Sequence, residues 1–362
     1  MLTKTSESIE LFLLSADDYE SLARYLMTFP DETGDLDFWR DRFRLWWEDN
    51  PAFSNGLARG WVLKNNDKIV GFMGNLSTSF LLAGKPIIVN SGTTWRVDSN
   101  YRTQSLRLFF ELLKYSKETL LFGTTPNDTV SRVLEMSKFQ LLPRGGRRTS
   151  VLITNFEKAL GALLPKNGGG RLMVKALAPI FDLIQQWRLT PADEKERLSV
   201  REVFKADPSF DELWEKTKNR YPYTSIRSAK IIHWYCFGSQ RFRKKLFGVY
   251  KDGLLWGYAI FANPQGRRLN FLECLDFWCE PGEKNAVGLL IDYLRKYAQK
   301  NSFDGVKFYG FSTEMDDLFK TAGLFQIRAK RSREYVRVKM KLEPPLSREN
   351  AYFSYMLGDI GL

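Results

Sequence analysis

The sequence predicts an α/β (α+β) protein of two tandem domains, each a mixed, mostly antiparallel twisted sheet flanked by helices. Three observations lead to this fold class. The 362 residues exceed a typical single core, and 44% of them are apolar, enough for two cores. Strand-like apolar runs alternate with amphipathic helical segments and hairpin turns. The order of these elements in the first half recurs in the second.

The first half begins with a strand over Ile9–Leu14, which an acidic stretch follows as the cap of a helix over Tyr19–Met27. Two hairpins come next, with turns at Asn65–Asp67 and Ala83–Lys85. Their strands are predicted over Gly60–Leu63, Lys68–Met73, Ser77–Leu82 and Pro86–Val97. Further helices are predicted over Asp37–Glu48, Leu106–Tyr115 and Thr129–Met136, and further strands over Thr119–Gly123 and Thr149–Thr154, the last closing the first domain.

The second half repeats the pattern after a glycine-rich linker. We predict an N-terminal domain over residues 1–160, a linker with an amphipathic helix over 161–197, and a C-terminal domain over 198–362. The linker helix, Leu172–Trp187, either packs against a domain, which is our expectation, or rests on a membrane. The second domain is predicted to end with a strand over Tyr335–Met340. Its other predicted strands cover Val200–Phe204, Leu246–Tyr250, Leu254–Phe261, Asn270–Phe277 and Gly305–Gly310, and its helices cover Phe210–Asn219, Ser225–Phe237, Asn285–Lys300 and Met315–Thr321.

Cysteine and histidine are scarce. The three cysteines form no CxxC pair, which predicts reduced thiols and no disulfide framework. The single histidine, His233, stands among apolar residues and is interpreted as structural. A zinc site needs clusters of these residues, so no metal is expected.

Hydropathy and charge limit the possible cellular locations of the protein and the possible classes of its partners. No stretch approaches the ~20 apolar residues of a bilayer-spanning helix, and the N-terminus lacks a secretory pattern, so we expect a cytoplasmic protein. The net charge of +12 favours an anionic partner, such as nucleotide phosphates, a sugar polymer, a tRNA or a lipid surface with peripheral contact. No helix-turn-helix or zinc-finger signature occurs, so DNA is not expected.

A strand-to-helix junction at Trp95–Phe110 reads WRVDSNYRTQSLRLFF. It resembles the signature of the Gcn5-related N-acetyltransferase (GNAT) superfamily, a strand ending in Val-x-Pro-x-Tyr-Arg before x-x-Gly-x-Gly/Ala at a helix start. Val97, Tyr101 and Arg102 match this pattern, whereas Ser99 replaces the proline.

The resemblance implies a coenzyme A site at this junction. Backbone N–H groups at the helix start would hold the diphosphate, and Thr94–Val97 would pair with the pantetheine amides like an added strand. Ser105 and Arg107 stand at the glycine positions of the signature, where the arginine either blocks the diphosphate or pairs with it. The implied substrate is acetyl-CoA or another acyl-CoA, and the residues assigned to it here are Trp95, Arg96, Val97, Arg102, Thr103, Gln104, Ser105, Leu106 and Arg107.

The segment after the next predicted strand, Thr125-Pro126-Asn127, is similar to a second GNAT segment whose asparagine contacts the cofactor. Asn127 therefore either inherits that contact or caps the helix that follows. Both interpretations stay open.

The second half resembles bacterial double-domain acyltransferases linked to polysaccharide and cell-envelope synthesis. The likeness rests on Phe210–Trp214, Arg227, His233–Trp234, Gly257–Tyr258 and the tail Tyr352–Asp359. The plan is also similar to Fem-type peptidoglycan aminoacyltransferases, which use aminoacyl-tRNA. The helix start at Pro281–Gly288 lacks Arg-x-x-Gly-x-Gly, so a second diphosphate site is not expected.

Acyl transfer to an amine needs a base for the amine, donors for the oxyanion and an acid for the thiolate. The strand Pro86–Val97 carries no carboxylate. Tyr101 can donate a proton from the junction. Glu273 and Asp276 lie at i and i+3 of one strand, which predicts opposite faces; one of them faces the interdomain cleft as the base or pairs with an arginine.

Three functions follow from these features. The first is an acyl-CoA-dependent N- or O-acyltransferase acting on an amino sugar or a cell-envelope or exopolysaccharide precursor, which rests on the junction. The second is an aminoacyl-tRNA-dependent transferase, which fits the basic charge. The third is a non-catalytic, degenerate GNAT-like protein that binds a glycan or a partner, which fits the missing glycines and the ten tryptophans.

Overall fold

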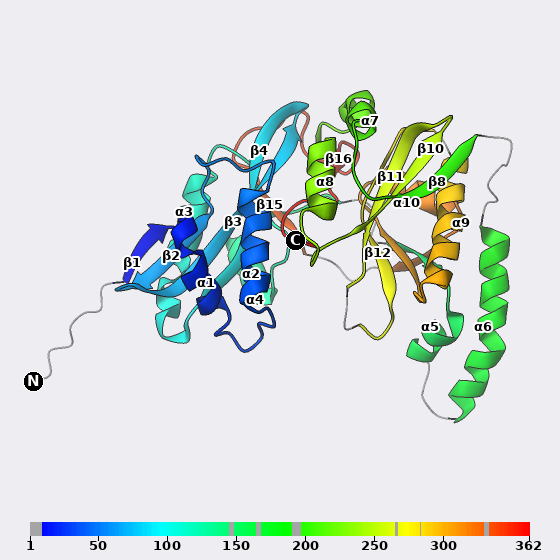
Figure 1. The fold of residues 1–362 in the computed structure, drawn as a ribbon, viewed down its shortest axis with the longest axis horizontal. Coiled ribbons are helices and arrows are strands. Elements are labelled where there is room, and N and C mark those ends of the chain that lie inside the picture. The colour runs from blue at the N-terminus through cyan, green and yellow to red at the C-terminus, as the bar shows by residue number, and fades with distance from the viewer. Residues whose placement is uncertain are drawn as a thin grey trace, which may run out of the picture.

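The computed structural model describes residues 9–144, 148–163, 168–189, 197–264, 267–282, 284–328 and 333–362. These residues form two mixed, mostly antiparallel sheets with helices on their faces (Figure 1). The predicted fold class is therefore confirmed. Residues 164–167 and 190–196 of the predicted linker lie outside the described residues.

The first sheet is built mainly from the N-terminal half. Its strands are β1 (Ile9–Leu13), β2 (Gly60–Asn65), β3 (Lys68–Leu82), β4 (Lys85–Val97), β5 (Leu121–Gly123), β6 (Gln140–Leu141), β9 (Tyr223–Ser225), β15 (Tyr335–Arg337) and β16 (Ala351–Tyr352). The order across the sheet is β1-β2-β3-β4-β5-β15-β6, with β9 on the far end of β3 and β16 beside β9. The pairs β4–β5 and β9–β16 are parallel.

The second sheet is built mainly from the C-terminal half. Its strands are β7 (Arg148–Ile153), β8 (Leu198–Val203), β10 (Lys245–Lys251), β11 (Leu254–Ala262), β12 (Phe271–Cys279), β13 (Gly305–Tyr309) and β14 (Phe325–Arg328). They are ordered β14-β7-β13-β12-β11-β10-β8, and β12 and β13 are parallel. This parallel pair occupies the position that β4–β5 holds in the first sheet.

Each half contributes at least one strand to the sheet of the other half, and two predictions are therefore wrong. The strand predicted over Thr149–Thr154 does not close the first sheet, because β7 pairs with β13 and β14 of the second. The strand predicted over Tyr335–Met340 does not close the second sheet, because β15 pairs with β5 and β6 of the first. An apolar run indicates a strand but carries no information on its partner, which distant edges of the sheets supply.

The two strands predicted over Lys68–Met73 and Ser77–Leu82 are one continuous strand, β3. Gly74 lies between them, and a Cβ there would come within 2.9 Å of the Thr93 side chain. The glycine thus marks a close approach of β4 and not a break in the strand. As a result, β3 pairs with β2, β4 and β9 along its length.

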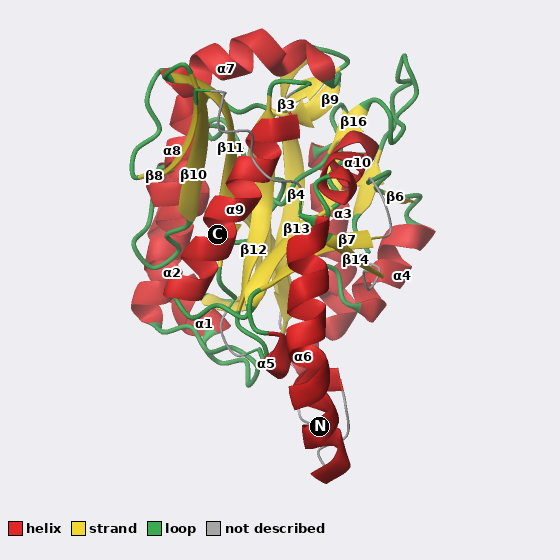
Figure 2. Cartoon of the chain, turned by 90° about the vertical axis from the view of Figure 1, so that its right-hand side faces the viewer, coloured by secondary structure: helices red, strands yellow, loops and turns green. Residues whose placement is uncertain are grey.

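The helices cover both sheets (Figure 2). They are α1 (Tyr19–Leu26), α2 (Leu36–Phe43) continued by a wider turn η2 (Arg44–Glu48), the 3-10 turn η3 (Ser99–Gln104) leading into α3 (Ser105–Tyr115), α4 (Asp128–Met136), α5 (Phe156–Leu163), α6 (Gly168–Arg188), α7 (Ser209–Thr217), α8 (Ala229–Phe237), α9 (Lys284–Lys300) and α10 (Thr313–Thr321), with short 3-10 turns at Ala16–Asp18 and Lys218–Arg220. Caps begin several of them: the Asn127 and Ser228 side chains accept the N–H of the residue three positions on.

One apolar core runs through both halves of the molecule. At the junction, the Trp234 indole of α8 donates to the Leu45 carbonyl at 2.9 Å, and the Phe38 and Phe242 rings meet edge-on with centroids 5.4 Å apart. A separate cluster around Phe109 lies under α3 and α4 on the other face of the first sheet. The two halves are therefore packed as one body.

Candidate active site

β4 and β5 run side by side briefly and then diverge. They pair at Asn90–Leu121 and Ser91–Phe122, and the Asn90 N–H donates to the Leu120 carbonyl at 3.2 Å. Beyond Ser91, β4 continues along β3, while the chain after β5 turns into α4. We call residues 92–97 and 122–125 the fork.

The C-terminal tail, Ala351–Leu362, brings a carboxylate to the fork. The Thr93 hydroxyl donates to Asp359 Oδ2 at 2.5 Å. The hydroxyls of Thr124 and Thr125 lie 3.5 and 3.4 Å from Asp359 Oδ1. A single half-buried carboxylate thus connects both diverging strands.

A glycine and a tyrosine hold the tail in this position. Gly358 has φ +86°, and a Cβ there would lie 2.4 Å from the Thr124 hydroxyl, so only glycine brings the tail this close. The Tyr235 hydroxyl of α8 lies 3.1 Å from the Tyr355 carbonyl and 2.9 Å from the Ile360 carbonyl and donates to them. Burial raises the pKa of Tyr235 well above its ordinary value, which keeps the phenol protonated as a donor.

The guanidinium of Arg42 in α2 lies among aromatic rings and interacts electrostatically with Asp359. Its guanidinium carbon lies 4.7 Å from the centre of the Trp46 ring and 5.4 Å from that of Phe38. Its buried Nε has no hydrogen-bond partner among the described residues. Burial lowers the pKa of Arg42, and the carboxylates of Asp359 and Glu32 act in the opposite direction.

A bulge shapes the β4 side of the fork. The pairing of Phe72 with Arg96 and of Gly74 with Thr93 leaves one extra residue on β4. Within this extra length Thr94 adopts φ +49°, a conformation that non-glycine residues rarely hold. Bulges re-aim the side chains that follow them, and they recur beside active sites.

Three residues that the sequence assigned to coenzyme A lie in this bulge or directly after it. Trp95 stacks on Phe109 of α3 with centroids 5.3 Å apart. Arg96 donates to Asp31 at 2.8 Å. Val97 pairs with Gly71 of β3 at the end of the strand. The first two side chains are already engaged in packing or in an ion pair.

At the start of α3, two backbone N–H groups that the resemblance implies are exposed are instead hydrogen-bonded within η3. In η3 the Tyr101 N–H donates to the Asp98 carbonyl at 2.9 Å, and the Ser105 N–H donates to the Arg102 carbonyl. Arg102 and Thr103 remain exposed at this corner. Anion binding here would therefore depend more on side-chain charge than on free backbone donors.

The other residues of the junction lie along the first turn of α3. Arg107 Nη1 donates to the Ile9 carbonyl of β1 at 2.9 Å and to Gln104 Oε1 at 3.1 Å. The Arg107 side chain thus lies against β1. Ser105 is half-buried and Leu106 is exposed.

Tyr101 and Asn127 each contribute to local structure. The Tyr101 hydroxyl accepts a hydrogen bond from Asn65 Nδ2 at 2.9 Å, which connects η3 to the β2–β3 turn. Asn127 Oδ1 accepts the Val130 N–H at 2.9 Å as the cap of α4. Asn127 is exposed just beyond the β5 side of the fork, so the cap and a ligand contact are compatible.

The two second-half carboxylates are both engaged. Asp276 is fully buried and accepts two hydrogen bonds from Arg227, each of 3.0 Å, and one from the Tyr258 hydroxyl at 2.9 Å. Glu273 pairs with Lys307 at 3.2 Å and accepts the Tyr309 hydroxyl at 2.8 Å. Of the two alternatives left open for these carboxylates, the structure shows ion pairs.

The predicted opposite faces for Glu273 and Asp276 are wrong. The register between β11 and β12 shifts between Ile260 and Phe261, which leaves Leu275 as an extra residue between the two acids. A bulge of one residue reverses the alternation of side chains along a strand. The tail covers both acids, through a Ser354 contact with Arg227 and the Tyr355 ring on Tyr309.

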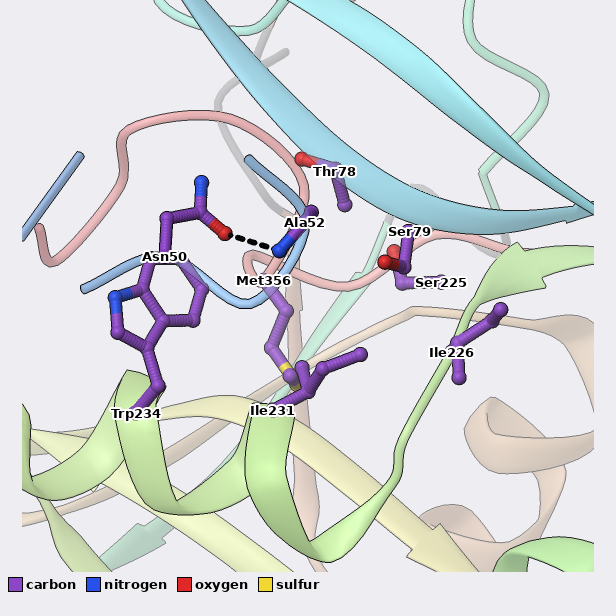
Figure 3. A pocket seen from close by; sticks show the side chains of 9 residues that line it. All are labelled: Asn50, Ala52, Thr78, Ser79, Ser225, Ile226, Ile231, Trp234 and Met356. Atoms are coloured by element: carbon purple, nitrogen blue, oxygen red, sulfur yellow. Dashed lines mark hydrogen bonds between the residues drawn. The ribbon is translucent and has the colours of Figure 1, made fainter. Parts of the chain in front are cut away.

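A small cavity lies at the junction of the halves (Figure 3). It holds about 10 Å³, roughly one water molecule, and Asn50, Thr78, Ile231 and Met356 are among its lining residues. A larger open cavity of about 420 Å³ is lined by Asp49, Lys230, His233 and Trp234, among others. His233, the single histidine, therefore lines a surface cavity. Its Nδ1 has no hydrogen-bond partner among the described residues.

The described residues contain neither a cluster of metal ligands nor an exposed cysteine thiol. Within them no group of three or more His, Cys, Asp or Glu side chains is placed to hold a metal ion. The three cysteines are free and buried, and burial raises the pKa of Cys236 and of Cys279 to about 12. Such thiols stay protonated and are poor nucleophiles.

The fold has counterparts among solved structures, although no family model and no curated protein matches the sequence. A GCN5-related N-acetyltransferase from Anabaena variabilis has a TM-score of 0.58 at 14% identity, over 91% of this chain and 73% of that one. A protein of unknown function from Enterococcus faecalis, described as a probable N-acyltransferase, has a TM-score of 0.61 at 10% identity, over 91% and 73%. N-myristoyltransferase from Saccharomyces cerevisiae with bound myristoyl-CoA has a TM-score of 0.51 at 13% identity, over 92% of this chain and 84% of that one. The chain thus has the fold of GNAT-type acyltransferases.

Sequence reasoning missed the residues that meet at the fork. Thr93, Thr124 and Asp359 are separated by up to 266 positions, and none stands in a motif that marks it as polar and functional. In the sequence, the tail through Asp359 stands out by its likeness to other proteins and not by its carboxylate. A signal was present in Gly358-Asp359, a turn residue before an acid at the end of an aromatic segment.

Proposed function

We propose that this protein transfers an acyl group from an acyl-CoA thioester to an amine at the fork. One observation carries the proposal: β4 and β5 diverge after two pairs, and a carboxylate held by threonines from both sides lies where they separate. The fold likeness to acyltransferases, one of them with bound myristoyl-CoA, supports it.

The fork offers the groups that this reaction needs. Asp359 accepts the proton of the attacking amine as the new N–C bond forms and the C–S bond breaks, and the leaving thiolate then takes up that proton from Asp359 or one from water. Thr93 orients the carboxylate through its hydroxyl. Because the Asn90 N–H points to β5, the Gly92 N–H two residues on points the same way and can stabilise the oxyanion.

The pantetheine and the diphosphate of the acyl-CoA donor would contact different parts of the junction. The diverging edge of β4 suits the amides of pantetheine, which would bind as an added strand at Thr94–Val97. The diphosphate would meet the exposed Arg102 and Thr103 rather than a glycine loop, since the Ser105 amide is bonded within η3. Asn127, exposed beside β5, completes this proposed binding set.

We extend the proposal to the acceptor of the acyl group and to the cellular compartment of the protein. The acceptor class is an amino sugar or a cell-envelope precursor, and the compartment is the cytoplasm. The acylated group is an amine, with a hydroxyl as the alternative. A non-catalytic glycan-binding protein is the second candidate. It is favoured by the 420 Å³ cavity, which is lined in part by the half-buried aromatic side chain of Trp234.

A thermal-shift screen against acetyl-CoA and longer acyl-CoAs tests the donor, because a ligand of the native state raises the midpoint. We expect a rise with at least one acyl-CoA and release of free thiol when an amine acceptor is added. Absence of any rise with folded protein would remove coenzyme A from the proposal. Glycan binding without thiol release would favour the second candidate.

The charge at the junction is tested with Arg102→Glu, which should weaken acyl-CoA binding about fivefold or more by repelling the diphosphate. Lys85→Glu, a charge reversal at the exposed start of β4, is the matched control and should leave the affinity unchanged. Equal affinities for both variants would place the diphosphate elsewhere.

A further inference from the structure

The outward side of α6 carries exposed apolar side chains between Leu172 and Trp187. Six large apolar side chains there are exposed, with fractions of 85% for Trp187, 74% for Leu172 and 68% for Leu183 as the highest. The complete set, which we call the α6 stripe, is Leu172, Met173, Ile180, Leu183, Ile184 and Trp187. Water-exposed apolar surface of this extent usually marks an interaction site.

The α6 stripe is separate from the side of α6 that packs on the protein. At 3.6 residues per turn its six members fall within an arc of about 120°. The opposite side carries the contacts to the body: Phe181 stacks on Phe156, Ala178 is buried, and the Gln185 amide is hydrogen-bonded to both backbone groups of Ile153. The helix therefore has two apolar sides, and only one of them is used within the chain's described residues.

The charges of α6 suit an anionic surface. Arg171 and Lys175 border the stripe on one side and Arg188 on the other, against one acid, Asp182, in the helix. Arg171 and Lys175 are exposed, whereas Arg188 also donates to the Gly323 carbonyl at 3.3 Å. The chain as a whole carries a net charge of +12, which adds long-range attraction.

The position of α6 leaves the stripe accessible to a flat surface. Figures 1 and 2 both show α6 at one end of the molecule, with its N-terminal half extending past the second sheet beside α5. Its 21 residues span about 31 Å. None of the described helices has both the length and the apolar content needed to cross a bilayer.

We propose that α6 lies in the plane of an anionic lipid surface, with the α6 stripe among the acyl chains and its basic borders at the headgroups. A helix with an apolar face, an exposed tryptophan and basic flanks has the composition of interfacial amphipathic helices. A second copy of the chain is disfavoured as the occupant, because the stripe is one helix wide and self-pairing would bring basic borders together. The proposal is independent of transfer activity at the fork.

Sedimentation with lipid vesicles tests the proposal. We expect the full chain to pellet with phosphatidylcholine vesicles that contain phosphatidylglycerol, to bind weakly to phosphatidylcholine alone, and to dissociate as salt is raised. The variant Ile180→Glu/Leu183→Glu should lose about tenfold or more in partitioning, because two charges enter the apolar layer. Leu254→Glu, a similarly exposed leucine at the start of β11, should bind like the wild type.

Two further measurements separate lipid binding by α6 from misfolding and from attraction by net charge alone. Circular dichroism and a thermal midpoint close to wild type show that the double variant is folded, as expected for exposed positions. Arg171→Glu/Lys175→Glu should reduce binding to anionic vesicles and leave binding to neutral ones unchanged.

The proposal is overturned if the wild type stays in the supernatant with anionic vesicles or if the double variant pellets equally well. It is also overturned if size exclusion shows a wild-type dimer that the double variant converts to a monomer, because the stripe then belongs to a second copy.

Discussion

The molecule contains two parallel strand pairs that diverge, and it uses them differently. In the first sheet β4 and β5 separate after two paired positions, and in the second β12 and β13 separate after three. The tail reaches both places. At the second pair its Tyr355 N–H donates to the Leu275 carbonyl at 2.9 Å, and the Tyr352 ring packs on Trp278.

The chemistry at the two places differs in burial. The second holds the Arg227–Asp276 pair, both side chains 0% exposed, with the guanidinium 4.2 Å from the Trp278 ring centre. The first holds Asp359, half-buried and bonded to neutral hydroxyls. Asp276 is engaged by a bidentate arginine and a buried tyrosine, whereas Asp359 is bonded to threonine hydroxyls. The comparison gives the second pair a structural task, and the chemical task is the one that we propose for the fork.

The largest effect is expected from Arg227→Ala. Removing the arginine leaves Asp276 buried and unpaired, which should lower the free energy of unfolding by about 3–5 kcal/mol. Urea denaturation measures it. Arg96→Ala, which breaks the exposed pair with Asp31, should cost less than about 1 kcal/mol. If the two variants unfold alike, the second pair is not the structural one.

Asp359→Asn should act on the reaction more than on the fold. The amide oxygen still accepts from Thr93, so the tail stays in place, but the proton acceptor is lost. We expect kcat to fall about 100-fold with the thermal midpoint nearly unchanged. Asp67→Asn in the exposed β2–β3 turn is the control. Full activity in Asp359→Asn would exclude this residue as the base.

Gly358→Ala tests whether the close approach of the tail is required. The left-handed conformation costs alanine about 1–2 kcal/mol, and the clash with Thr124 adds to it. Gly84→Ala shares the positive φ, +76°, but meets open space, so the difference in unfolding free energy between the variants isolates the clash. Equal losses would mean that the tail moves away from Thr124 without cost.

The smallest effect concerns the pH dependence of Lys244, which lies under the tail near Gly361. Its amine donates to the Tyr235 and Phe242 carbonyls, and burial lowers its pKa from 10.5 to about 8. Above that pH the unfolded chain binds the proton more strongly, so the unfolding free energy rises with pH relative to Lys244→Met. The gain should be about 1 kcal/mol between pH 8 and 9. Equal pH profiles for the two proteins would contradict a lowered pKa, and Lys245→Met, at an exposed ion pair, should match wild type.

Much of the secondary structure could be predicted because it depends on neighbours in the sequence. The hairpin turn at Ala83–Lys85 and the amphipathic helix over Leu106–Tyr115 are found as β3–β4 and α3. Partner strands could not be predicted, since β7 and β15 each found an edge in the other half. At the site, the strand-to-helix junction was recognised, but the state of its amides depends on η3, which the matching residues do not determine.

The sequence by itself determined most of the longer strands and helices, that the thiols are too few for a disulfide framework, and which junction resembles an acyl-CoA site. These properties follow from local patterns of side chains. The tertiary structure decided that Thr93, Thr124 and Asp359 meet, and that Asp276 is paired with Arg227. Such contacts arise from the packing of distant segments, and a bulge of one residue, as at Leu275, is enough to turn a side chain to the other face.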